Sequence, residues 1–188
     1  MKKVYYFILL TIGWCSNSFA VQNCNNQTPS STPTTQFIVN ENRVVVDTHT
    51  ALMWKRCPEG YTFSDNSTPM NTDDDACTEN GIDPKLFSWQ EALQKAVTVN
   101  NNGGFAAYTD WRVPNVKELS SIVEIQCAYP AINSFIFPGA LTGMYWTSST
   151  SASSGYNSWV TDFDLGVSTT QGKTVIQPLH LRLVRDFQ

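Results

Sequence analysis

RVVVDTHTALMWK, residues 43–55, is the stretch that decides the fold of this chain. Its two halves, residues 43–47 and 51–55, are β-branched or apolar, and Thr48-His49-Thr50 separates them. Two short runs of this kind with a polar turn between them predict a β-hairpin. Ordered structure is therefore expected to start near Phe37, with the later elements packing around the hairpin.

Two helices are predicted after the hairpin, each beginning at a capping box. In these boxes Ser88 pairs with Glu91 and Asn115 with Glu118, so that each side chain bonds the other residue's free backbone N–H. The first helix ends at residues 102–104. Behind the caps the apolar residues fall on one helical face: Trp89, Ala92, Leu93, Ala96 and Val97 in the first helix, and Val116, Leu119, Ile122 and Val123 in the second.

The rest of the chain is predicted to be strand. Residues 145–148, 158–164, 173–177 and 179–185 alternate or run apolar, with glycines between them. A hairpin, two helices and several antiparallel strands make an α+β domain, in which the last strand can return beside the first.

The first twenty residues have the layout of a secretory signal peptide. Lys2 and Lys3 precede a short apolar run, and Ser18-Phe19-Ala20 supplies the small residues of a cleavage site. We expect cleavage after Ala20, a polar N-terminal linker over residues 21–36 and one domain over residues 37–188. The run is too short to span a bilayer. The protein is thus expected to be exported to the periplasm, the cell surface or the medium, with no membrane span after cleavage.

Cleavage would leave an even number of cysteines, Cys24, Cys57, Cys77 and Cys127. An even count in an exported chain favours disulfides, and four cysteines can pair in three ways. We favour Cys57–Cys77, which closes a polar stretch of about twenty residues, and Cys24–Cys127, which would tie the N-terminal segment to the body. The spacings do not indicate a zinc site.

The chain is acidic. Its net charge is −4, and loss of Lys2 and Lys3 with the signal would make it −6. This charge argues against nucleic acid and strongly anionic polymers as partners.

Five blocks of the sequence resemble one family. They are Asp47-Thr48 with Ala51-Leu52-Met53-Trp54-Lys55-Arg56, then residues 88–93 (SWQEAL), residues 108–119 (YTDWRVPNVKEL), residues 145–149 (YWTSS) and residues 181–185 (LRLVR). In this order they resemble the Lcl C-terminal-domain family, a domain of unknown function, from about Phe37 to the end.

The resemblance implies a C-type-lectin-like fold, related to that of formylglycine-generating enzyme. The best-known relative is a bacterial surface adhesin that binds sulfated glycosaminoglycans. This chain differs from it in being acidic and in lacking a collagen-like repeat, and both differences argue against glycosaminoglycan binding here.

No catalytic residues are predicted. His49 lies in the hairpin turn and His180 on a predicted strand, and neither accompanies a nucleophile motif. Cysteines paired in disulfides leave no thiolate for nucleophilic or copper-assisted chemistry. Asp162 and Asp164 share one strand face, but a glycosidase needs two facing carboxylates.

Aromatic side chains give the stronger signal for binding. Trp54, Trp89, Trp111, Trp146 and Trp159 lie in or beside predicted elements, and most are expected to fill the core. Trp111 and Trp146 belong to the two most distinctive blocks, and an exposed aromatic face can stack on a sugar ring. The candidate ligand-binding residues are Trp111, Tyr145, Trp146 and Tyr156. The loops at residues 145–156 and 71–83 are the expected rim.

Calcium is the one metal that the acidic clusters suggest, because Ca²⁺ prefers carboxylate and carbonyl oxygens. The candidate ligands are Asp73, Asp74, Asp75, Asp162 and Asp164, although neither cluster has EF-hand spacing and an acidic loop is commonly a solvated surface.

Together these features predict an exported, non-enzymatic binding domain, acting in adhesion or glycan recognition with a glycan or a surface protein as partner. The alternatives are a structural or accessory component of a surface assembly and, third, a hydrolase.

Overall fold

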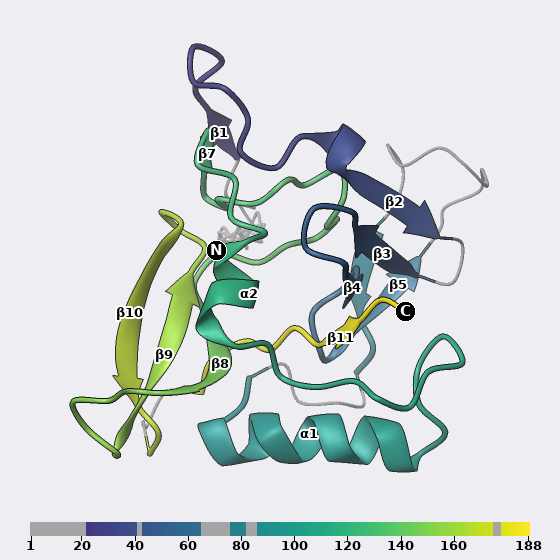
Figure 1. Ribbon diagram of the computed structural model, residues 1–188, viewed down its shortest axis with the longest axis vertical. Helices are drawn as coiled ribbons and strands as arrows, with labels where there is room; N and C mark the ends of the chain where they lie inside the picture. The colour runs from purple at the N-terminus through teal and green to yellow at the C-terminus, as the bar shows by residue number, and fades with distance from the viewer. Residues whose placement is uncertain (1–21, 41–42, 65–75, 82–85, 175–177) are drawn as a thin grey trace, which may run out of the picture.

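The computed structural model describes residues 22–40, 43–64, 76–81, 86–174 and 178–188. Within these ranges two α-helices accompany four small antiparallel sheets (Figure 1). The α+β prediction is therefore confirmed. The predicted signal peptide, residues 1–20, lies outside the described residues. No helix among the described residues is long and apolar enough to cross a membrane.

The predicted hairpin forms the centre of a four-stranded sheet with the order β11-β4-β3-β2. Strands β2 (Phe37–Asn40), β3 (Val44–Asp47) and β4 (Leu52–Lys55) are consecutive in the chain, whereas β11 (Val184–Asp186) comes from its end. The last strand thus returns to the first sheet as expected, where it pairs with β4 through Val184 and Trp54.

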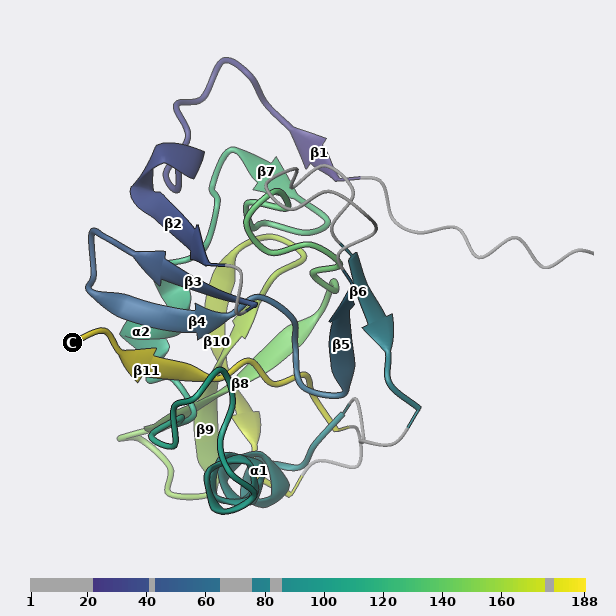
Figure 2. The ribbon, with the colours of Figure 1, turned by 90° about the vertical axis from the view of Figure 1, so that its right-hand side faces the viewer.

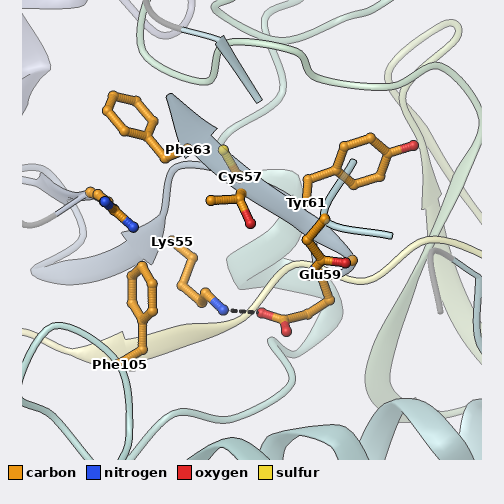
Figure 3. Close-up of a pocket in the computed structure, with 10 residues that line it drawn as sticks. Lys55, Cys57, Glu59, Tyr61, Phe63 and Phe105 are labelled. Carbon is orange, nitrogen blue, oxygen red and sulfur yellow. Dashed lines mark hydrogen bonds and ion pairs between the residues drawn. The ribbon is translucent and has the colours of Figure 1, made fainter. Parts of the chain in front are cut away.

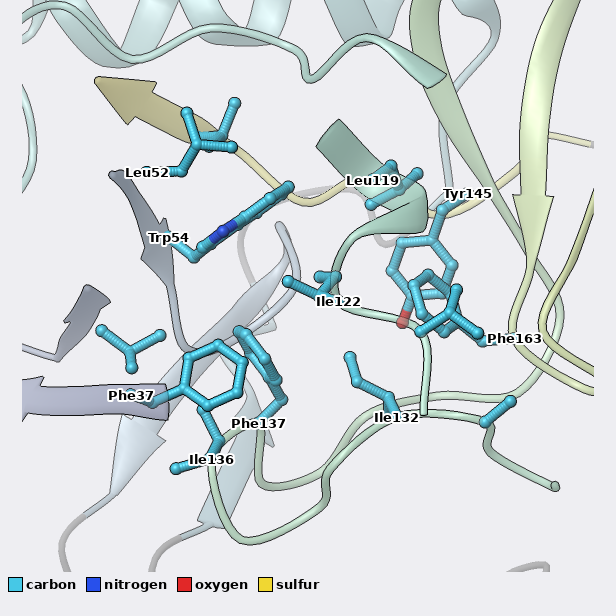
Figure 4. Packing of buried hydrophobic residues seen from close by; sticks show 14 residues of the cluster. Phe37, Leu52, Trp54, Leu119, Ile122, Ile132, Ile136, Phe137, Tyr145 and Phe163 are labelled. Atoms are coloured by element: carbon cyan, nitrogen blue, oxygen red, sulfur yellow. The ribbon is translucent and has the colours of Figure 1, made fainter. Parts of the chain in front are cut away.

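Both faces of the β3–β4 hairpin are buried, which explains its nearly continuous apolar sequence. One face, with Val45 and Trp54, packs in a cluster with α2 and the loops that follow it (Figure 4). The opposite face carries Val44, Val46 and Met53 into a second cluster beneath α1. The hairpin therefore joins two halves of one core.

The two helices begin where the capping boxes predict. Helix α1 (Trp89–Asn101) starts after Ser88, whose backbone N–H donates to Glu91 Oε2 at 2.7 Å. Helix α2 (Val116–Ser120) starts after Asn115, whose side chain accepts two backbone N–H groups. Helix α2 is shorter than its apolar stripe suggested. Ile122 and Val123 are buried, but they belong to the turn that follows the helix.

A second sheet has the order β10-β9-β8. Strands β8 (Met144–Thr150) and β9 (Asn157–Asp162) match the prediction, but β10 (Val167–Gly172) was not predicted, because its serines, threonines and glutamine give a weak apolar signal. Of the strand expected at 173–177, residues 175–177 lie outside the described residues. The strand expected at 179–185 was too long, since within it only the residues of β11 form a regular strand.

Two short strand pairs complete the structure. Strand β1 (Asn23–Cys24) pairs with β7 (Cys127–Ala128), and β5 (Tyr61–Ser64) pairs with β6 (Ala76–Glu79). Disulfides Cys24–Cys127 and Cys57–Cys77 reinforce these pairs, which confirms the favoured pairing. The segment expected as a linker is held against the body by β1, and a 3-10 turn (Thr34–Gln36) leads from it into β2.

Candidate functional site

The end of β4, the start of β5 and the loop after α1 surround a cavity of about 190 Å³. We call it the Lys55 hollow. Figure 3 shows Lys55 and Glu59 joined by an ion pair, with Phe105 on one side of them and Phe63 and Tyr61 on the other. Residues 55–63 and the loop that carries Phe105, which are far apart in the sequence, thus meet at one charged pair.

The ion pair is almost closed to solvent. Glu59 is only 4% exposed, and Lys55 Nζ contacts its Oε1 atom. Lys95 of α1 approaches the other carboxylate oxygen at 3.9 Å. Lys55 Nζ also lies 4.3 Å from the centre of the Phe105 ring, a distance typical of a cation–π contact. The lysine is therefore fixed from two sides.

A buried arginine holds the turn that carries this pair. Arg182 has no exposed surface, and its Nη1 atom donates to the backbone carbonyls of Lys55 (2.8 Å) and Arg56. The backbone N–H of Glu59 donates to Leu181 O at 2.8 Å. Burial lowers the pKa of Arg182 from its ordinary value, against the opposing effect of Tyr145. The guanidinium thus braces the backbone from inside.

The Phe105 loop is fixed by a glycine and a tryptophan. Gly104 has φ +77°, and a Cβ atom there would lie 2.0 Å from Tyr108 O, so only glycine fits without rearrangement. Trp111 donates from Nε1 to Phe105 O at 3.0 Å and packs edge-on against the Phe105 ring. Phe105 is consequently held in place by the core.

The opposite wall is the β5–β6 hairpin, which the Cys57–Cys77 disulfide ties to the end of β4. Phe63 lies 4.8 Å from the Arg56 guanidinium carbon, and Arg56 also donates from Nε to Ile136 O at 3.0 Å. Arg43 lines the hollow and is exposed, and it has no ion-pair partner among the described residues.

This arrangement is suited to binding a ligand that has both apolar and polar groups. The two phenylalanine rings offer apolar faces, and Arg43 and Lys55 offer N–H donors. Two cations against the one lining carboxylate, Glu59, give the hollow a positive charge, although the whole chain is acidic. The described lining residues present one carboxylate, whereas the two-carboxylate mechanism of glycosidases needs a facing pair.

Three of the four predicted ligand-binding residues do not reach the surface. Trp111, Tyr145 and Trp146 are at most 2% exposed, so they cannot stack on a ligand in this structure, and that prediction is wrong for them. Burial raises the pKa of the Tyr145 hydroxyl. These residues are distinctive because they pack the core, and Trp111 contributes to the Lys55 hollow indirectly, through Phe105.

Tyr156, the fourth, is 87% exposed on the loop between β8 and β9. Figures 1 and 2 place this loop and strands β5 and β6 on opposite sides of the molecule. Of the second expected loop, only residues 76–81 are described, and they do not share a rim with residues 145–156, so the prediction is wrong for them. Asn80 of this stretch lines the Lys55 hollow instead.

The predicted calcium ligands fall into two groups. Asp73, Asp74 and Asp75 lie outside the described residues. Asp162 and Asp164 close the turn after β9, where Asp162 Oδ1 accepts Asp164 N–H and Asp164 Oδ1 accepts Gly143 N–H, both at 2.8 Å. Within the described ranges no three His, Cys, Asp or Glu side chains gather as a metal site.

Sequence reasoning missed the residues of the Lys55 hollow. Lys55 and Glu59 are four residues apart beside a cysteine, and Phe105 follows two glycines, but none of these features is specific alone. The one usable signal was the Gly103-Gly104 pair, which indicates a tight turn that projects the next side chain.

Comparison with known families gives one match. Residues 43–185 match the family described as Lcl C-terminal domain, so the chain belongs to that family, as its sequence blocks suggested. No curated protein matched the chain. The matched range contains most of the Lys55 hollow's framework, from Arg43 through Phe105 to Arg182, and excludes residues 22–42.

Proposed function

We propose that this member of the Lcl C-terminal domain family is an exported, non-enzymatic binding domain that recognises a glycan in the Lys55 hollow. The observation that carries the proposal is the hollow itself, in which two phenylalanine rings accompany Lys55 and Arg43, an exposed arginine without an ion-pair partner in the described part of the chain. Sugars present apolar C–H faces and polar edges, and aromatic rings beside N–H donors match both.

The charge of the hollow points to one class of sugar. A single anionic sugar unit, such as a uronic acid, would meet Arg43 and Lys55 while its ring lies near Phe105. A polyanionic polymer would instead experience the negative field of the whole chain. The proposed ligand is therefore a glycan with isolated carboxylated units, and the proposed role is adhesion or surface recognition.

Export is part of the proposal. Residues 1–20 have the layout of a secretory signal, and the two disulfides need an oxidising compartment to persist. A C-type-lectin-like arrangement is proposed on the same footing, supported by the family membership, the two helices and the return of β11 to the first sheet.

The experiment is a glycan array probed with the chain starting at Val21, followed by calorimetric titration of any bound sugar. We expect carboxylated glycans to bind, and Arg43→Ala and Phe105→Ala each to weaken binding at least tenfold, about 1.4 kcal/mol. Phe187→Ala removes an aromatic that is 47% exposed elsewhere and is the matched control. Silence across neutral, carboxylated and sulfated glycans would count against the proposal.

A second candidate function, an accessory component of a surface assembly, is favoured by the edge strand β2. Ile38 and Val39 of this strand are 60% and 36% exposed, and exposed edge strands readily pair with another chain. Native mass measurement of the protein isolated from its source would detect a stable hetero-complex, and a monomer would argue against this function.

A further inference from the structure

A second and larger cavity, of about 390 Å³, lies between the N-terminal segment and the stretch from Glu124 to Phe135. We call it the N-terminal hollow. Its walls are joined by the β1–β7 pair and by the Cys24–Cys127 disulfide. The Gln22 side-chain amide adds hydrogen bonds to Pro130 O at 2.7 Å and Ile132 O at 2.6 Å. The cavity is thus built and braced on both sides.

The one charged residue that lines this cavity, Glu124, already has hydrogen-bond partners for its carboxylate oxygens. Glu124 is 3% exposed and accepts hydrogen bonds from the backbone N–H groups of Ser31, Thr32 and Gln126, at 2.9 to 3.0 Å. The hydroxyl groups of residues 30–32 donate to the same carboxylate. With this many donors its oxygens are occupied, so Glu124 serves to dock the segment and offers little to a ligand.

The groups that remain available are uncharged. The side-chain amides of Asn26 and Gln126 line the cavity and make no hydrogen bond within the described part of the chain. Each amide offers two N–H donors and a carbonyl acceptor. Beside them Phe135 is 57% exposed and offers an apolar face.

We infer that the N-terminal hollow binds a neutral, hydroxyl-rich ligand, namely an uncharged sugar unit. Amides that both donate and accept pair well with neighbouring hydroxyl groups, and the Phe135 ring offers a face for the sugar's C–H surface. An anion would meet Glu124 with no cation among the lining residues. A cation would find that carboxylate already saturated. The volume lies within the ordinary range of small-molecule sites.

This site is independent of the Lys55 hollow and does not rest on its proposed function. Asn26 and the other walls of the N-terminal segment precede the family-matched range, residues 43–185. The inference therefore concerns a property of this chain's N-terminal segment.

The test is a titration of isotope-labelled protein, residues 21–188, with maltotriose, tri-N-acetylchitotriose and mannotriose. Glucuronate and glucosamine serve as charged comparators. We expect at least one neutral sugar to shift the side-chain amide signals of Asn26 and Gln126, and neither charged comparator to do so at equal concentration. Gln126→Glu and Phe135→Ala should each weaken binding at least tenfold.

Matched controls separate the site from general effects. Gln94→Glu changes an exposed glutamine on α1 and Phe187→Ala an exposed phenylalanine near the C-terminus, and both should bind as the unaltered protein does. Phe105→Ala should also leave this binding unchanged, which separates it from the Lys55 hollow. Asn26→Asp is a second variant of the binding site. Asn26 is exposed, so this substitution should not disturb folding. No shift with any of the three neutral sugars, or full binding in both Gln126→Glu and Phe135→Ala, would overturn the inference.

Discussion

The two hollows differ in the groups that surround their buried carboxylates. In the Lys55 hollow a buried carboxylate, Glu59, faces cationic side chains, and a buried arginine braces the backbone beneath. In the N-terminal hollow the buried Glu124 faces only hydroxyl and backbone N–H groups. The comparison teaches that the groups around a buried carboxylate decide what a hollow offers: cationic side chains in the Lys55 hollow and uncharged amides in the N-terminal hollow.

The two sites also differ in how they are tied to the core. The Lys55 hollow sits at the end of the central sheet and, through Phe105 and Trp111, on the core cluster beneath α1. The N-terminal hollow depends on a short segment fixed by the β1–β7 pair, one disulfide, the Gln22 amide and one carboxylate. The second site is therefore expected to be the more easily detached, and the following predictions test that difference in order of decreasing effect.

The largest effect is expected from removing the disulfides. Chain entropy predicts a loss of about 4.7 kcal/mol of unfolding free energy for Cys24–Cys127, which spans 103 residues, and about 3.3 kcal/mol for Cys57–Cys77, which spans 20. Urea unfolding of the Cys24→Ser/Cys127→Ser and Cys57→Ser/Cys77→Ser variants measures both. If the Cys24→Ser/Cys127→Ser variant loses less unfolding free energy than the Cys57→Ser/Cys77→Ser variant, residues 22–36 detach without unfolding the rest of the domain. The chain-entropy values then do not apply.

The next effect concerns the arginine under the Lys55 hollow. Arg182→Met removes the donor to Lys55 O and Arg56 O and leaves two interior carbonyls without that partner, so we expect a loss of about 3 kcal/mol. Arg43→Met, an exposed arginine on the same hollow, should change stability by less than about 0.5 kcal/mol. Equal losses in the two variants would contradict the bracing role.

The third prediction concerns pH. Burial disfavours the charged form of Glu124, but hydrogen bonds from Ser30, Ser31, Gln126 and Thr32 outweigh it and lower its pKa from 4.5 to about 2. The unfolded chain then binds more protons between these values, so the contribution of Glu124 is complete above pH 4.5 and is lost as the pH falls towards 2. Glu124→Gln should cost about 2 kcal/mol near neutral pH and less in acid.

Unfolding measured in urea at several pH values checks this prediction. Asp110→Asn is the control, because Asp110 is 56% exposed and pairs with Arg185 near the surface, where ion pairs contribute under about 1 kcal/mol. A Glu124→Gln deficit that stays constant from neutral pH to about pH 2 would show that the carboxylate does not dock the segment through its charge.

The smallest effect is expected at Tyr156. Its side chain is 87% exposed and lines neither hollow, so Tyr156→Ala should change stability by less than about 0.5 kcal/mol and sugar binding not at all. Thermal unfolding measures the change in stability. The calorimetric titration and the titration of isotope-labelled protein measure sugar binding at the two hollows. Weakened sugar binding in this variant would indicate that the binding site lies on the loop between β8 and β9.

Local signals predicted much of the fold. The hairpin, both capping boxes, strands β8 and β9 and the Cys57–Cys77 disulfide rest on short-range patterns, and the structure has each of them. Cys24–Cys127 was expected as the remaining pair, and it forms too. The failures share one cause. Trp111, Trp146 and Tyr145 were chosen because their blocks are distinctive, but a distinctive aromatic is as readily a core residue as a ligand contact, and periodicity does not distinguish the two.

The sequence by itself determined the central hairpin, the starts of both helices, the acidic charge and the family, because each depends on neighbouring residues or on composition. Only the tertiary structure decided where the binding surfaces lie. Lys55, Phe105 and Arg182, like Asn26 and Gln126, are brought together by the return of distant segments, and no local pattern encodes those distances. The physical reason is that a cavity belongs to the packing of several elements at once.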